Sequence, residues 1–151
     1  MLIMNREELV RRYTAGQRNF IGVSLDGIDL TNANLSGVDF SNASLGEAYM
    51  EGANLSNAIV RYTHLGQVCL ENSNLRGIDL TGSNLSHANL KGVDLTDAQL
   101  VNVNFSVTDL IETNFTRANI RGAKEWEEAW IENCIFVQTI MPDGCIRNDN
   151  T

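Results

Sequence analysis

Two histidines and three cysteines are the side chains with the strongest chemistry in this chain of 151 residues. His64 and His87 could bind a metal or move a proton, and Cys69, Cys134 and Cys145 could act as nucleophiles or metal ligands. The cysteines form no C-x-x-C pair, and no carboxylates or cysteines converge with the histidines in a tetrahedral pattern. The sequence therefore predicts no catalytic residue, no cofactor and no metal site.

Serines, threonines and glycines are abundant, but they recur at regular intervals and build no phosphate-binding motif. The regularity comes from a large apolar residue at every fifth position. A period of five matches neither an α-helix nor a flat strand, so the chain must turn a corner within every unit of five. The positions are Phe20, Leu25, Leu30, Leu35, Phe40, Leu45, Met50, Leu55, Val60, Leu65, Leu70, Leu75, Leu80, Leu85, Leu90, Leu95, Leu100, Phe105, Leu110, Phe115 and Ile120.

Each unit of five is expected to be a very short strand followed by a corner. The residue two before the large one is small or β-branched, as Ala33 is before Leu35, so both side chains share the inward face. The residue between them, such as Asn34, is usually polar and points outward. The last two positions favour the turn formers Gly, Asn, Ser and Thr. A single unit buries almost nothing, so neighbouring units must stack to form a core.

Three runs of the chain, at 33–37, 53–57 and 88–92, read ANLSG, ANLSN and ANLKG. They resemble the A(D/N)LXX motif of the pentapeptide-repeat family, and the resemblance covers 21 consecutive units, about two thirds of the chain. It implies an all-β solenoid: a right-handed quadrilateral β-helix with four units and twenty residues per coil, here about five coils long. The helical start and the closing segment 139–144, TIMPDG, further resemble cyanobacterial members.

In such a square, residues twenty apart would share one column on one side. One outward column is almost purely asparagine, and we expect it to pass side-chain hydrogen bonds from coil to coil. A straight rod with a solid leucine core is also expected to offer no concave pocket, which argues against catalysis. The column consists of Asn34, Asn54, Asn74, Asp94 and Asn114.

The chain divides into three parts: an N-terminal helical cap (1–18), the β-helix (19–122) and a C-terminal cap of helix and turns (123–151). The run from Asn5 to Tyr13 predicts a helix with Asn5 as its N-cap, covering the open end of the first coil. The rhythm fails at Glu125 and resumes one residue late, and Met141 to Gly144 predicts a tight turn.

The sequence shows no signal peptide and no apolar run of eighteen residues, so we expect a cytoplasmic protein with no membrane partner. Reduced thiols fit that location, and a disulfide between Cys134 and Cys145 is the alternative. The oligomeric state stays open between a monomer and a weak homo-oligomer formed through a coil end.

Apolar and aromatic residues in outward positions are one departure from the repeat. Tyr49 and Cys69 share a column on neighbouring coils. Ile59 is expected on an adjacent side, with Arg61 and Tyr62 at the next corner. Such residues are enriched at protein interfaces, although single surface hydrophobes are also common. We predict that these five residues contact another protein; the alternative is that Tyr62 merely covers a poorly filled coil.

Charge is the second departure, since the net charge is −8 and residues 19–122 hold eleven acids against five bases. One side would carry Asp29, Glu51, Glu71, Asp109 and Glu112 against only Lys91. Such a side could imitate DNA phosphates and engage a basic groove, and the resembled family includes proteins that bind DNA gyrase in this way. A merely solvated acidic surface is the alternative. The chain shows neither the long inserted loop nor the apolar C-terminal dimerisation segment of those relatives.

Together these features predict a non-enzymatic protein that acts as a protein-interaction surface or regulatory scaffold, with no direct nucleic-acid binding. An acidic DNA mimic that binds gyrase or another topoisomerase is the alternative function.

Overall fold

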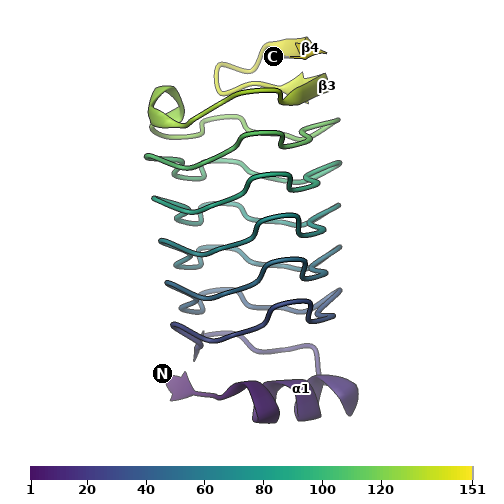
Figure 1. Cartoon of the computed structure of the whole chain (residues 1–151), viewed down its shortest axis with the longest axis vertical. Helices are drawn as coiled ribbons and strands as arrows, with labels where there is room; N and C mark the ends of the chain where they lie inside the picture. Colours follow the sequence, from purple (N-terminus) through teal and green to yellow (C-terminus); the bar gives the residue numbers. More distant parts are fainter. Residues whose placement is uncertain (151) are drawn as a thin grey trace.

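The computed structural model describes residues 1–150, and the repeats in it form a stack of four-sided coils (Figure 1). Isolated parallel bridges join residues that are twenty apart, from the pair Asn19 and Asp39 to the pair Asn104 and Lys124. The bridges fall into four columns, so the prediction that residues twenty apart lie above one another is confirmed.

The stack has four sides, numbered in chain order, and each is defined by the outward residues at its centre. The first side carries Asn19, Asp39, Ile59, Asp79, Gln99 and Asn119, and the second carries Ser24, Ser44, His64, Asn84, Asn104 and Lys124. The third side carries Asp29, Tyr49, Cys69, Asn89 and Asp109, and the fourth carries Asn34, Asn54, Asn74, Asp94 and Asn114. The first side is therefore opposite the third.

The core is the column of large residues inside the coils. Every member of the five-residue rhythm from Phe20 to Ile120 is at most 4% exposed. Corners close tightly because their second residue has left-handed backbone, as at Asn32 (φ 57°) and Gly52 (φ 65°). A Cβ on Gly52 would lie 2.3 Å from the Asn32 carboxamide oxygen, so glycine is needed there for room as well as for conformation.

The side chains of the asparagine column on the fourth side form most of their hydrogen bonds within their own coils. The side-chain oxygens of Asn54 and Asn74 accept hydrogen bonds from the amides of Ser56 and Arg76, two residues later, at 3.0 and 3.1 Å. Within residues 1–150 one amide-to-amide bond joins neighbouring coils of this column, from Asn54 Nδ2 to Asn34 Oδ1 at 3.2 Å. The predicted ladder was therefore wrong for most of the column, because the short side chain closes its own corner.

The N-terminal end is covered by a short strand and a helix. Strand β1 (Leu2–Ile3) pairs in parallel with β2 (Val23–Ser24). Helix α1 (Arg6–Thr14) follows the N-cap Asn5, whose side chain accepts from the Glu8 amide at 2.9 Å, as the sequence predicts. The helix lies across the first coil and buries Leu9 completely (Figure 1).

The C-terminal end contains one extra residue. A single 3-10 turn, η1 (Trp126–Glu128), follows Lys124, and the bridges beyond it join residues 21 apart, such as Asp109 and Trp130. The late resumption of the rhythm is thus confirmed, and the bridged stack continues past residue 122 to Ile140.

A hairpin closes this end of the stack. Strand β3 (Ile135–Ile140) pairs antiparallel with β4 (Ile146–Asn150). The predicted turn lies between them, with the Gly144 amide donating to the Met141 carbonyl at 2.9 Å.

Two buried serines at equivalent inward positions differ in hydrogen bonding. Ser83 Oγ donates to the Val60 carbonyl at 2.6 Å and accepts from the Thr63 amide at 2.9 Å. Ser73 Oγ is buried, and nothing within residues 1–150 accepts from it or donates to it. A buried polar group in that state costs about 1–3 kcal/mol.

We therefore expect Ser73→Ala to raise the free energy of unfolding by about 1 kcal/mol, measured by denaturant unfolding. The matched change Ser83→Ala should lower it by about 1–2 kcal/mol, because the Thr63 amide loses its acceptor. Equal effects of the two changes would contradict this difference in hydrogen bonding.

Candidate functional site

The five predicted partner-contact residues lie on opposite sides of the stack. Tyr49 and Cys69 are bridged neighbours on the third side, whereas Ile59 lies on the first. The expectation that Ile59 is on an adjacent side was wrong, because ten residues are two units and therefore two corners of the square. Tyr49 is 55% exposed and Ile59 40%, but one flat contact cannot cover both.

The first-side group is occupied by contacts within the chain. The Arg61 guanidinium donates to the Asp79 carboxylate at 2.6 Å. Burial alone would raise the pKa of Asp79, but hydrogen bonds from Arg61 and Thr81 outweigh it and hold that pKa below its usual range. The Tyr62 ring lies against Gly82, where a Cβ would come within 2.6 Å of two ring carbons. Arg61 is therefore held by an ion pair, whereas Tyr62 packs against Gly82 and is still 64% exposed.

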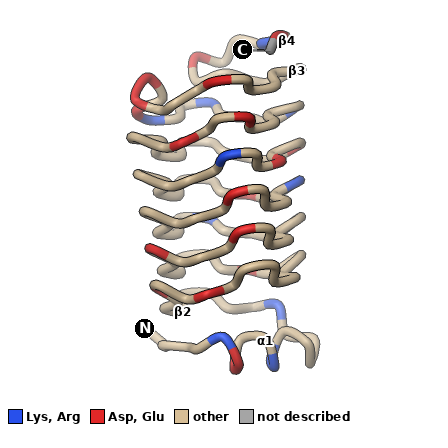
Figure 2. Tube along the Cα trace, in the orientation of Figure 1, with Lys and Arg blue, Asp and Glu red and all other residues tan. Residues whose placement is uncertain are grey.

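The predicted acidic residues gather on the third side and on the corner that follows it. Figure 2 shows a row of acidic residues running up the front of the stack, interrupted by one basic residue. Within the described chain, Asp29 is the member of the predicted set with an ion pair, to Arg6 at 3.5 Å between exposed groups. The amide of Thr31 donates to Asp29 and lowers the pKa of its carboxyl. The corner residues, in order along the stack, are Thr31, Glu51, Glu71, Lys91, Ile111 and Glu132, with Glu112 beside Ile111.

Arginines of the repeats neutralise acids on other sides. Besides the pair of Arg61, Arg76 pairs with Asp94 at 3.1 Å, and Arg117 pairs with Asp97 at 2.6 Å. None of these pairs lies on the third side. The negative charge of Glu51, Glu71 and their neighbours is therefore left facing solvent, where it can attract a basic surface.

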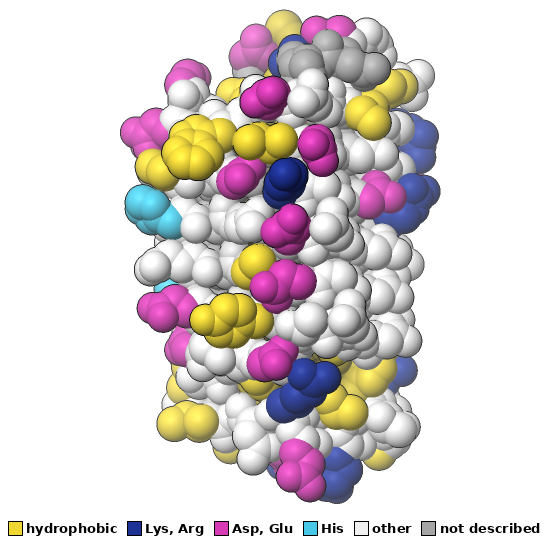
Figure 3. Space-filling view, in the orientation of Figure 1, with side chains coloured by type: hydrophobic (Ala, Val, Ile, Leu, Met, Phe, Trp, Pro, Cys, Tyr) yellow, Lys and Arg dark blue, Asp and Glu magenta, His cyan; other side chains and the backbone are white. Residues whose placement is uncertain are grey.

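Trp130 is a third-side residue that sequence reasoning missed. It is bridged to Asp109 at the C-terminal end of the column and is 59% exposed. Figure 3 shows hydrophobic side chains next to acidic ones on this face of the molecule. The one-residue delay after Glu125 was the signal that could have placed both Trp130 and Glu132 on this side. With coils about 4.8 Å apart, Tyr49 and Trp130 are separated by about 19 Å.

The thiols of Cys69 on the third side and of Cys134 near the C-terminal end are poorly suited to covalent chemistry. Burial raises the pKa of the Cys69 thiol, which keeps it protonated and weakly nucleophilic at neutral pH. The Cys134 thiol is buried and donates to the Leu110 carbonyl. Residues 1–150 contain no group of three or more His, Cys, Asp or Glu side chains arranged to hold a metal.

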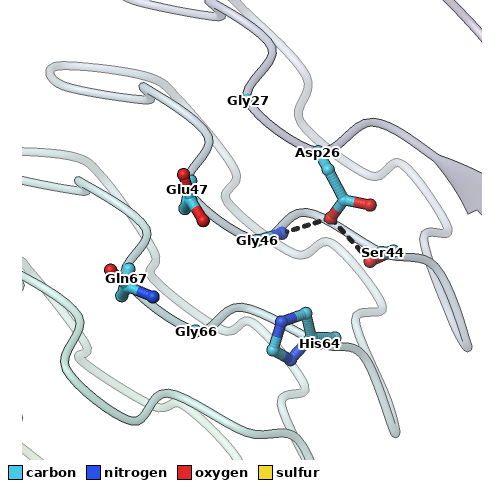
Figure 4. Close-up of a pocket in the computed structure, with 8 residues that line it drawn as sticks. All are labelled: Asp26, Gly27, Ser44, Gly46, Glu47, His64, Gly66 and Gln67. Atoms are coloured by element: carbon cyan, nitrogen blue, oxygen red, sulfur yellow. Dashed lines mark hydrogen bonds between the residues drawn. The ribbon is translucent and has the colours of Figure 1, made fainter.

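A hollow of about 370 Å³ opens at the corner between the second and third sides (Figure 4). The expectation that the rod has no concavity was therefore wrong. Two glycines in consecutive coils, Gly46 and Gly66, form its floor, and Asp26, His64 and Glu47 stand around it. Neither glycine has left-handed backbone, and a Cβ at either position would collide with the His64 ring, so glycine there makes room for that ring.

The hollow contains a serine, a histidine and an aspartate, but they do not form a catalytic relay. The Asp26 carboxylate accepts from Ser44 Oγ at 2.6 Å and from the Gly46 amide at 2.8 Å. His64 forms no hydrogen bond with either residue within the described chain. A serine nucleophile needs the histidine between itself and the carboxylate, so this arrangement cannot activate Ser44.

Comparison with protein-family models gives a match to pentapeptide repeats in eight copies, over residues 19–57, 33–72, 61–97 and 88–124. No curated protein matches the chain. No helix within residues 1–150 is long and apolar enough to cross a membrane.

Several solved structures are similar. A pentapeptide repeat protein from Nostoc PCC 7120 is 32% identical, with a TM-score of 0.57, over 72% of this chain and 82% of that one. HetL, a Nostoc pentapeptide repeat protein involved in heterocyst differentiation regulation, is 24% identical over 95% of this chain and all of that one, with a TM-score of 0.33. QnrB1, a plasmid-mediated fluoroquinolone resistance protein, is 19% identical over 78% of this chain and 75% of that one, with a TM-score of 0.50, so that likeness shows the fold alone.

Proposed function

The chain belongs to the pentapeptide-repeat family, and from that premise we propose that it is a non-enzymatic protein-interaction surface whose contact face is the third side. One observation carries the proposal. The third side and its following corner combine two exposed aromatic residues, Tyr49 and Trp130, with acids that have few ion pairs inside the described chain. Three arginines of the other sides, Arg61, Arg76 and Arg117, are already paired.

Aromatic anchors in a charged surround are what protein interfaces favour. Tyr and Trp contribute large contact areas at low cost in side-chain entropy, and they are frequent hot spots of binding energy. The acidic rim would attract a basic partner and speed its association. The third side therefore suits a protein partner with a basic, partly apolar surface.

We also propose the handedness and cross-section of the β-helix, the bounds of its two end segments and the location of the protein. Family membership supports the right-handed quadrilateral β-helix. We assign residues 1–18 and 123–151 to its two ends, with residue 151 outside the described part of the chain. Bridges through Ile140 suggest that the first part of the C-terminal segment completes a further coil. A cytoplasmic location remains part of this proposal.

A photo-crosslinking residue at position 49 tests the contact face. In the native host we expect Tyr49→p-benzoylphenylalanine to capture a discrete protein, since this position carries an exposed aromatic residue of the proposed contact. The same residue at Ile59, on the opposite side, or at Asn74, on the fourth side, should capture none. Mass spectrometry would then identify the captured protein.

With that partner purified, Tyr49→Ser should weaken binding at least tenfold in a titration, as expected of a hot-spot aromatic. Its melting temperature should change little, because the ring is more than half exposed. Capture at position 59 with none at position 49 would move the contact to the first side and end the proposal.

A second candidate function rests on the acidic row itself. Asp29, Glu51, Glu71, Asp109 and Glu112 occupy one side and its corner, so they could take the place of DNA phosphates in the groove of gyrase or another topoisomerase. Tyr49, Cys69 and Lys91 interrupt that row and favour the first candidate. If gyrase supercoiling is unaffected by a large excess of the purified chain, the mimic is excluded.

A further inference from the structure

We propose that the hollow above Gly46 and Gly66 binds the guanidinium group of an arginine supplied by the protein partner. The inference rests on the proposed function and adds to it the chemistry of one contact. The hollow opens beside the third side, and Glu47 on its rim is two residues before Tyr49. An arginine held there would bring the chain that carries it next to the tyrosine ring.

Two glycines let the His64 ring lie against the wall of the hollow. At the first corner position after the second side, successive coils carry Asp26, Gly46, Gly66, Ser86 and Ser106. A Cβ on Gly46 would lie 2.9 Å from His64 Nε2 and 3.2 Å from Asp26 Oδ1, and a Cβ on Gly66 would lie 2.8 Å from His64 Cε1. Any larger residue at either position would displace the His64 ring from its place beside Asp26.

Acceptor groups surround this space. Figure 4 shows Asp26 and His64 on one side of the two glycines, and Glu47 and Gln67 on the other. Asp26 is held in place because Oδ1 accepts from Ser44 and Gly46, while Oδ2 accepts one longer bond from Ser24 Oγ at 3.3 Å. Neither Asp26 nor Glu47 has an ion pair within residues 1–150, and no lysine or arginine lines the hollow.

A guanidinium group fits this arrangement better than other charged groups do. It is planar, so it can stack on the exposed His64 ring, which lies over the two glycines, and its five N–H donors point in several directions at once. Carboxylates on opposite walls can then both accept from one group. A lysine ammonium is a compact and strongly hydrated charge that would reach one wall, and an anion would be repelled by Asp26 and Glu47.

The test is a titration of the isotope-labelled full chain with N-acetyl-arginine-amide, followed through the amide NMR signals of Gly46 and Gly66. We expect both signals to shift in a saturable way at millimolar concentrations, as is usual for so small a ligand. N-acetyl-citrulline-amide has the same shape but no charge, and N-acetyl-lysine-amide has the charge without the planar group. Both should bind at least fivefold more weakly.

Two substitutions localise the binding. Asp26→Asn keeps an oxygen for the Ser44 and Gly46 hydrogen bonds but removes the charge, and it should weaken arginine binding at least fivefold. Gly66→Ala displaces the His64 ring from the wall of the hollow and should weaken arginine binding to a similar extent. The matched controls are Asp109→Asn, which removes an equal charge from the third side, and Ser86→Ala, at the same corner position one coil on. Both should change binding less than twofold.

Three results would overturn the inference: citrulline or lysine derivatives that bind as well as arginine, no shift at the two glycines, or equal weakening by the control variants. The crosslinking experiment at position 49 is independent of this titration. Capture at position 49 without arginine binding would remove the hollow from the contact and leave the proposed function standing. Arginine binding without capture would support the hollow as an arginine site and exclude the third side as the contact face.

Discussion

Leu75→Asp is expected to abolish cooperative folding of the chain. Leu75 is 0% exposed and lies in the middle of the leucine stack, and the buried residues of the described chain include no Lys or Arg that could pair with a carboxylate. The substitution removes an apolar side chain and buries a charge, mechanisms that each cost several kcal/mol. The combined cost, about 5 kcal/mol or more, is comparable to the whole stability of a typical domain.

The neighbouring change Asn74→Asp is the matched control. Position 74 points outward in the same unit, and Asp94 in the same column already accepts from the Thr96 amide at 3.0 Å. An aspartate at 74 can accept from the Arg76 amide in the same way, so the free energy of unfolding should change by less than about 0.5 kcal/mol. Thermal unfolding followed by circular dichroism measures both variants. A cooperative transition in Leu75→Asp would contradict the inward placement of the five-residue rhythm.

The inward and outward pattern could be predicted from sequence because it depends on one short-range constraint. A large residue at every fifth position can be buried only if the chain turns between units, and the buried set follows from that alone. The helix at Arg6–Thr14 could be predicted equally well, because its cap is local: Asn5 and Glu8 are three residues apart.

Features that depend on more than one coil were predicted less well. The side chains of Asn34 and its column were expected to form hydrogen bonds between coils. Each of them instead has a nearer donor, the backbone amide two residues later in its own corner. The hollow at Gly46 needs the orientation of the His64 ring from the next coil and the Asp26 carboxylate from the previous one. Neither orientation follows from the repeat period.

Register beyond the regular repeats was the other weak point. The sequence shows that the rhythm resumes one residue late, but not which residue leaves the column. In the structure the corner at η1 absorbs the extra residue. This returns Trp130 to the third side, while Trp126 turns toward the core.

The two tryptophans are therefore expected to respond in opposite ways to substitution. The Trp126 ring packs edge-on against Phe105 and Phe115, with centroids 5.5 and 5.8 Å apart, and it covers the C-terminal end of the core. Trp126→Ala should lower the free energy of unfolding by about 2–4 kcal/mol, because it exposes both phenylalanines. Trp130→Ala should change it by less than about 0.5 kcal/mol.

Denaturant unfolding of the two variants measures this difference, and a binding titration with the captured partner measures the other half. Trp130→Ala should weaken partner binding at least fivefold, since the ring is an exposed anchor of the third side. If Trp130→Ala unfolds the protein and Trp126→Ala does not, the extra residue lies elsewhere and the third side ends before Trp130. If both are stable and bind normally, the C-terminal end contributes neither a cap nor a contact, and the interaction face contracts to the coils around Tyr49.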